Sequence, residues 1–80
     1  MREVQIDCRD GMEAIHRQLA EALEFPDWYG ANLDALYDCL TDLGEPVCLT
    51  VREPQLLPAL ERVLEDAAGE NPLLEVWMSQ

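Results

Sequence analysis

The sequence contains no lysine, and its five basic side chains are all arginines. Seventeen Asp and Glu residues outnumber them, so the 80-residue chain carries a formal net charge of −12. A field of this sign repels nucleic acid and anionic membranes and attracts basic partners. We therefore expect no binding to DNA, RNA or membranes. Acidity can also serve solubility alone, but that would not explain a local row of acidic residues.

The sequence features that mark common catalytic and metal sites are also missing. The glycines are scattered, so there is no Gly-rich phosphate loop, and the cysteines form no C-x-x-C pair. His16 is the only histidine and has no recognisable nucleophile partner. It borders an apolar helix face, where we expect a histidine at the edge of an interface or a partly satisfied surface histidine. We expect no enzymatic activity, no cofactor and no metal site.

Long apolar runs are absent as well. No run approaches the length of a membrane span, and no apolar core of signal-peptide length follows the N-terminal arginine. Cys8, Cys39 and Cys48 are odd in number and lie within apolar segments, which favours free thiols in a reducing compartment. These features predict a cytoplasmic protein, and we expect it to be a monomer when free.

The hydrophobic periodicity predicts one α/β domain over residues 1–80 with the element order βααβαβ. The predicted strands are residues 3–8, 47–51 and 73–79, and strand–helix–strand spacing favours parallel pairing. The apolar run 47–51 is expected to be covered on both faces, and Trp77 and Met78 to supply bulk to the last strand.

Start and stop signals place the three predicted helices. Asp10 and Glu13 have capping-box spacing at the start of the first helix, which runs to about Glu24. The second helix is capped by Asn32 and stopped by Gly44. Pro54 and Pro58 predict either a short turn followed by a third helix from Pro58 or one helix kinked between them, and we favour the first; Gly69 ends this helix.

Three aspartates recur four residues apart in the second predicted helix. Asp34, Asp38 and Asp42 fall nearly opposite its leucines and should face solvent. Like charges at this spacing destabilise a helix by about 0.2–0.5 kcal/mol per pair, so something should offset the cost. A straight helical row cannot wrap a cation, which argues against a magnesium or calcium site.

Aromatic side chains accompany this acidic row. Trp28 and Tyr29 lie in the preceding loop, and Tyr37 lies within the helix. Aromatic anchors beside a charge patch of one sign are typical of a protein–protein hot spot, here one for a basic partner. The pattern alone leaves an alternative open, in which Trp28 or Tyr29 is buried in the core and the aspartates are merely solvated.

The segment FPDWYGANLDALYDCL, residues 25–40, resembles the signature of the barstar family, the small intracellular inhibitors of secreted bacterial ribonucleases. In that family a P-x-Y-Y-G-x-N-L-D-A-L-W-D-C-L run forms the inhibitory loop and helix. The resemblance extends less strongly from the first helix, including His16, to Pro46. It implies a two-layer α/β fold, in which three to four helices pack against a three-stranded parallel sheet.

The resemblance also implies roles for individual residues. Asp38, and secondarily Asp34, match acidic residues that enter the ribonuclease active site and mimic substrate phosphate. Trp28 matches a tyrosine that packs on the enzyme. The other residues that the resemblance places at the partner surface are Tyr29, Gly30, Asn32, Tyr37 and Asp66. Asp42 matches a glycine of the family, so its inclusion follows from its position in the acidic row.

The chain departs from the family pattern at the periphery of this surface. Leu43 replaces an aromatic residue, and the connection between the second strand and the last helix is distinctly shorter. The leading hypothesis is a non-enzymatic inhibitor that blocks the active site of a basic ribonuclease with carboxylates. The alternatives are an acidic interaction or immunity module for a non-ribonuclease toxin or another basic partner, and a metal-dependent enzyme.

Overall fold

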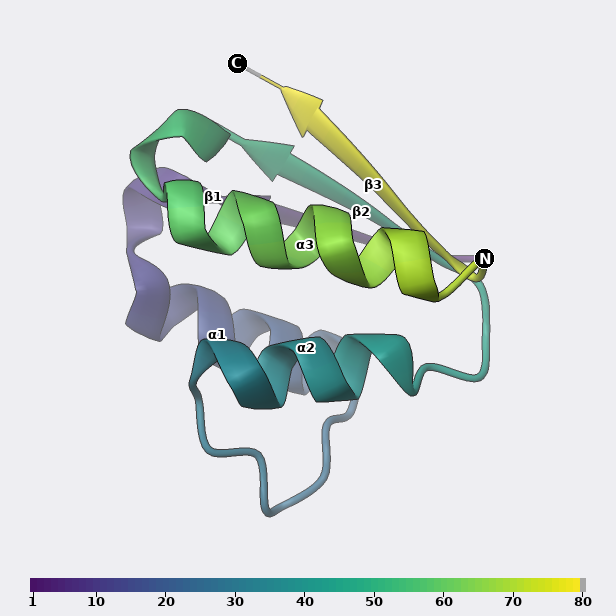
Figure 1. Ribbon diagram of the computed structural model, residues 1–80. Helices are drawn as coiled ribbons and strands as arrows, with labels where there is room; N and C mark the ends of the chain where they lie inside the picture. The colour runs from purple at the N-terminus through teal and green to yellow at the C-terminus, as the bar shows by residue number, and fades with distance from the viewer. Residues whose placement is uncertain (80) are drawn as a thin grey trace.

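The computed structural model describes residues 1–79 and arranges them as a parallel sheet with helices on one side (Figure 1). The strands are β1 (Arg2–Asp7), β2 (Val47–Arg52) and β3 (Leu74–Ser79), hydrogen-bonded in the order β1-β2-β3. The helices are α1 (Met12–Ala22), α2 (Leu33–Thr41) and α3 (Pro58–Glu70), with short 3₁₀ turns η1 (Cys8–Asp10) and η2 (Pro54–Leu56). The predicted fold class, element order and parallel pairing are confirmed.

The core lies between the sheet and the helices. Val4, Leu49 and Val76 are paired across the three strands and point to the helical side. The helices contribute leucines at the spacing of an amphipathic stripe, and these are fully buried: Leu19, Leu36, Leu40, Leu60 and Leu64. Each helix therefore presents its opposite face, including the acidic row of α2, to solvent.

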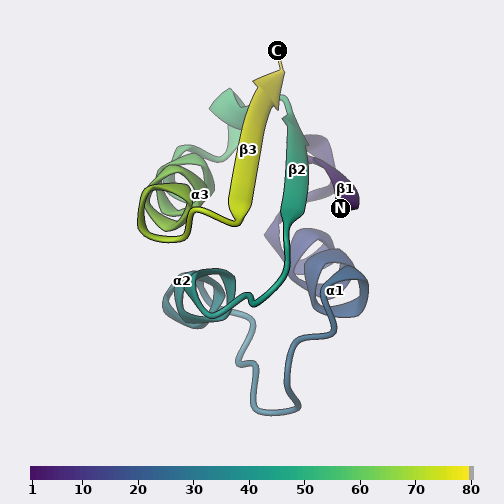
Figure 2. The same ribbon diagram turned by 90° about the vertical axis from the view of Figure 1, so that its right-hand side faces the viewer.

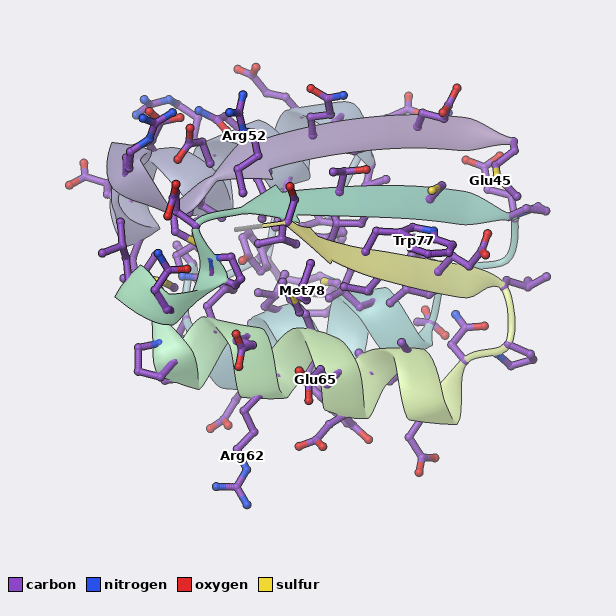
Figure 3. The ribbon with its side chains drawn as sticks, turned by 90° about the horizontal axis from the view of Figure 1, so that it is seen from above. Glu45, Arg52, Arg62, Glu65, Trp77 and Met78 are labelled. Carbon is purple, nitrogen blue, oxygen red and sulfur yellow. The ribbon has the colours of Figure 1, made fainter. Side chains whose placement is uncertain are left out.

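The prediction that β2 is covered on both faces is wrong. Val47, Leu49 and Val51 are fully buried, but Cys48 and Thr50 between them are only half-buried. All three helices pack on the same side of the sheet, so its second face stays open (Figure 2). Trp77 lies on this open face with 59% of its surface exposed (Figure 3), so it adds no bulk to the core. A short apolar run does not reveal which of its faces is covered.

The start of α1 also differs from the prediction. Asp10 does not cap the helix, because the preceding residues form the turn η1. In that turn the Asp7 carboxylate accepts a hydrogen bond from the Arg9 backbone N–H at 2.9 Å and pairs with the Arg9 guanidinium. These hydrogen bonds lower the pKa of Asp7 to about 2. Gly11, with φ 89°, becomes the N-cap and provides no side-chain hydrogen bond.

The helix ends show where local signals succeed and fail. Pro58 begins α3 after the separate turn η2, as predicted. Gly69 does not end α3, which continues to Glu70, and α2 ends at Thr41, before Gly44. Helix α1 likewise ends at Ala22 instead of Glu24. Helix ends depend on which tertiary partners satisfy the last carbonyl groups, and sequence does not report those partners.

Asn71, which is distant in sequence, satisfies carbonyl groups at the C-terminal end of α2. This side chain is 5% exposed, and its Nδ2 donates hydrogen bonds to the carbonyls of Leu40 at 3.0 Å and Leu43 at 3.1 Å. Its Oδ1 accepts a hydrogen bond from the Leu73 N–H at 3.0 Å. Asn71 therefore ties the C-terminal end of α2 to the turn that leads into β3.

Candidate functional site

The predicted site begins in the loop of residues 23–32, which joins α1 to α2 and protrudes away from the sheet (Figures 1 and 2). Glu24, just after α1, has a positive φ of 53°. The next residue, Phe25, donates its backbone N–H to the Ala20 carbonyl of α1 at 3.0 Å. A turn follows, closed by a 3.0 Å hydrogen bond from the Tyr29 N–H to the Pro26 carbonyl. These bonds fix the direction in which the loop leaves α1.

The two adjacent aromatics of this loop point in different directions. Trp28 has 67% of its surface exposed, whereas Tyr29 is half-buried and packs against Phe25 with ring centroids 4.9 Å apart. The Tyr29 hydroxyl shares a hydrogen bond with Nδ1 of His16. Burial of the phenol raises the pKa of Tyr29 to about 12. Trp28 is thus available to a partner, while Tyr29 anchors the loop.

His16 is buried, with 6% of its surface exposed, so the prediction of a surface histidine is wrong. Burial lowers the pKa of His16, because the interior disfavours the imidazolium. The residue follows the fully buried Ile15 on α1 and reaches the loop through Tyr29. The position of His16 beside the apolar stripe of α1 was a signal for its burial. Its hydrogen-bond partner, the Tyr29 hydroxyl, could not be predicted from the sequence.

The acidic row of α2 is exposed and has no paired cation within residues 1–79. Asn32 caps the helix as predicted, since its Oδ1 accepts a hydrogen bond from the Ala35 N–H at 2.8 Å. Asp34, Asp38 and Asp42 are all exposed. The ion pairs within residues 1–79 are formed by Arg2 and Arg9 with carboxylates elsewhere, and none involves α2. No arginine of these residues therefore compensates the row.

Tyr37 links the acidic row to α3. It is half-buried and packs against the core. Burial is the main cause that raises the pKa of Tyr37, and the negative charges of Glu70, Asp66 and Asp38 raise it further. Asp66 is exposed and close enough to act on this phenol, so α3 extends the acidic surface of α2. Sequence reasoning missed Glu70, although its spacing of four residues from Asp66 places both on one helix face.

A groove of about 710 Å³ lies between the loop of residues 23–32 and the C-terminal half of α2. It brings together three of the predicted site residues, Trp28, Asp38 and Asp42. The other predicted site residues do not line it: Tyr29, Gly30, Asn32, Asp34, Tyr37 and Asp66. The other lining residues are Leu23, Glu24, Phe25, Pro26, Cys39, Thr41, Leu43, Gly44 and Glu45.

The cysteines do not form a disulfide within the described residues. Cys8, Cys39 and Cys48 are free thiols, as predicted. Strand register pairs Cys48 with Glu3, which lies five residues before Cys8 in the chain, so these two thiols are not neighbours. Across residues 1–79, no three His, Cys, Asp or Glu side chains gather as a metal site would require. In the same residues, no helix has the length and apolar character needed to cross a membrane.

Comparison with known proteins gives a family match. The model of a family described as "Barstar (barnase inhibitor)" matches residues 1–77. A curated protein of Bacillus subtilis (strain 168), named "Putative ribonuclease inhibitor YrdF", is 56% identical over 43 residues. That alignment covers 51% of this chain and 47% of the relative, so the chain spans about half the length of the relative it matches.

Proposed function

Because this chain belongs to the barstar family, we propose that it inhibits a basic ribonuclease by inserting carboxylates of α2 into the active site of the enzyme. The role is one of binding and not of catalysis. A ribonuclease active site grips the phosphates of RNA with cationic side chains, so a fixed row of carboxylates can occupy the same groups. Three free thiols also fit an inhibitor that acts in the reducing cytoplasm of the producing cell.

The observation that carries this proposal is the uncompensated acidic row. Asp34, Asp38 and Asp42 are exposed, and no arginine within residues 1–79 pairs with them. Like charges one helical turn apart repel each other in the free protein. A cationic cleft on a partner removes that repulsion, so the row is better suited to the complex than to the isolated chain.

The remaining residues divide into anchors and supports. Asp38 lies centrally in the row and contacts the catalytic cations, with Asp34 one turn away in support. Trp28, which is 67% exposed, provides apolar area on the partner. The supporting residues at the partner surface are Tyr29, Gly30, Asn32, Tyr37, Asp42 and Asp66.

The deciding experiment measures protection of RNA from basic ribonucleases of the same cell. We expect Asp38→Ala to weaken inhibition by at least about thirtyfold, equivalent to about 2 kcal/mol, and Asp34→Ala to weaken it less. The matched control is Glu13→Gln, which also removes one negative charge but lies at the start of α1, away from the site. It should change inhibition by less than about threefold.

Circular dichroism of each variant establishes that the fold is kept. If folded Asp38→Ala inhibits as well as the unmodified protein, the carboxylate mechanism is wrong. If the unmodified chain inhibits none of the cell's ribonucleases but captures another basic toxin, the chain is instead an immunity module for that toxin.

A further inference from the structure

The groove beside α2 contains both paired and unpaired carboxylates. The Arg2 guanidinium lies 3.2 Å from a Glu45 oxygen and 3.5 Å from a Glu24 oxygen, and it also donates to the Ala22 carbonyl at 2.9 Å. Glu24 belongs to one rim of the groove and Glu45 to the other. One internal cation thus joins the two rims and neutralises part of their charge.

Asp38 and Asp42 line the same groove without an ion pair inside the described residues. Asp42 is the less favourable of the two in the free protein. It is the C-cap of α2, where the negative end of the helix dipole disfavours an anion, and it lies one turn from Asp38. Both effects oppose a carboxylate at this position unless a cation comes from outside.

The rest of the lining suits a long basic side chain. Trp28 offers an exposed indole face, against which a guanidinium can stack. Phe25, Pro26 and Leu43 supply apolar surface for the methylene stem that carries such a group. The Arg2 contacts give a second, independent indication, because they show a guanidinium already bound by two carboxylates of this groove.

We propose that this groove receives one arginine side chain of the partner ribonuclease, with Asp42 as its carboxylate ligand and Trp28 as its aromatic wall. The inference rests on the proposed function and names a second contact beside the active-site contact of Asp38. One helical turn, about 5.4 Å, separates the two positions, so Asp42 reaches a cation adjacent to those that Asp38 meets.

Arg2 is the positioning residue of this subsite. It touches no partner in the proposal and acts by holding residue 24 and residue 45, and hence the two rims, at a fixed separation. By pairing with Glu24 and Glu45 it also leaves Asp42 and Asp38 as the groove carboxylates without an ion pair inside the described residues. Loss of Arg2 would let the rims move apart and would add two unpaired anions.

The test compares Asp42→Asn with the control Glu13→Gln, each of which removes one negative charge. For the complex with the inhibited ribonuclease, we expect Asp42→Asn to speed dissociation at least about tenfold and Glu13→Gln to change it less than twofold. The melting temperature of free Asp42→Asn should equal or exceed that of the unmodified protein. Weaker binding by Asp42→Asn could then not be attributed to a loss of stability.

A double-mutant cycle on the stability of the complex tests the role of Arg2. Arg2→Gln should weaken the complex, Arg2→Lys should restore part of the loss, and the Arg2→Gln/Asp42→Asn pair should lose less than the sum of the two single changes. Additive effects would overturn the positioning role. If the protein inhibits the ribonuclease through Asp38 but Asp42→Asn behaves like Glu13→Gln, the arginine subsite is wrong and the proposed function stands. If no ribonuclease is inhibited, both fail.

Discussion

Tyr29 and His16 connect the proposed partner surface to the interior. The loop of residues 23–32 contains no helix or strand of its own, yet the Tyr29 hydroxyl is hydrogen-bonded to a histidine of α1 that is 6% exposed. Tyr29 also packs on Phe25, so a polar and an apolar contact fix the same ring. The neighbouring Trp28 is thereby held outward on a loop with limited freedom, which reduces the entropy lost on binding.

This pair makes stability depend on pH in a defined direction. The folded-state pKa of His16 is lowered, so below the ordinary histidine pKa of about 6.5 the unfolded chain takes up a proton that the folded chain resists. The contribution of His16 is complete above about pH 6.5 and is lost as the pH falls towards the folded-state pKa. Urea unfolding at pH 7.5 and 5.5 should show a larger loss for the unmodified protein than for His16→Gln. Equal losses would contradict this account.

At the scale of elements, the two ends of α2 are stabilised in different ways. Asn32 caps the N-terminal end locally and is exposed, whereas Asn71 satisfies the carbonyls at the other end from beyond α3. Asn71 also bonds the N–H of Leu73 and so fixes the entry into β3. The helix that carries the acidic row is therefore fixed to the sheet by one buried amide.

These two asparagines should differ in their contribution to the free energy of unfolding. Asn32→Ala removes a solvent-exposed cap and should cost about 1 kcal/mol. Asn71→Ala removes three hydrogen bonds and leaves buried carbonyls without their partner, which should cost about 2–3 kcal/mol. Urea unfolding of both variants gives the comparison. A smaller loss for Asn71→Ala than for Asn32→Ala would show that the buried amide does not hold α2 to the sheet.

At the scale of the whole molecule, the net charge of −12 acts over a longer range than any single contact. The surface of α2 and α3 concentrates part of that charge around Tyr37, whose pKa responds to carboxylates of both helices. Such a field guides a cationic partner before contact and repels polyanions. Under the proposed function, faster association with a basic partner would offset the self-repulsion of an acidic excess in the free protein.

Association with a basic ribonuclease should therefore depend strongly on ionic strength. Salt shortens the screening length to about 8 Å at physiological ionic strength, which weakens steering more than it weakens contacts inside the complex. Stopped-flow measurements should show the association rate constant falling at least about tenfold between about 0.02 and 0.5 M salt, with a much smaller change in dissociation. An association rate that does not respond to salt would exclude electrostatic steering.

Much of this protein was predictable from the sequence alone because the relevant signals are local. The strand and helix order, the Asn32 cap, the start of α3 at Pro58 and the outward aspartates follow from spacings of a few residues. The barstar-family match agrees with the resemblance carried by residues 25–40. A strict helical or alternating pattern fixes which side chains share a face, whatever the rest of the chain does.

The tertiary structure decided everything that depends on residues distant in sequence. It left one face of β2 open and buried His16 against Tyr29. It also brought Arg2 to Ala22 and Asn71 to Leu40, 20 and 31 residues apart, which no local pattern reports. Those contacts form only when the helices pack on the sheet. Packing buries polar and charged groups, which must then be hydrogen-bonded to groups that the fold brings next to them.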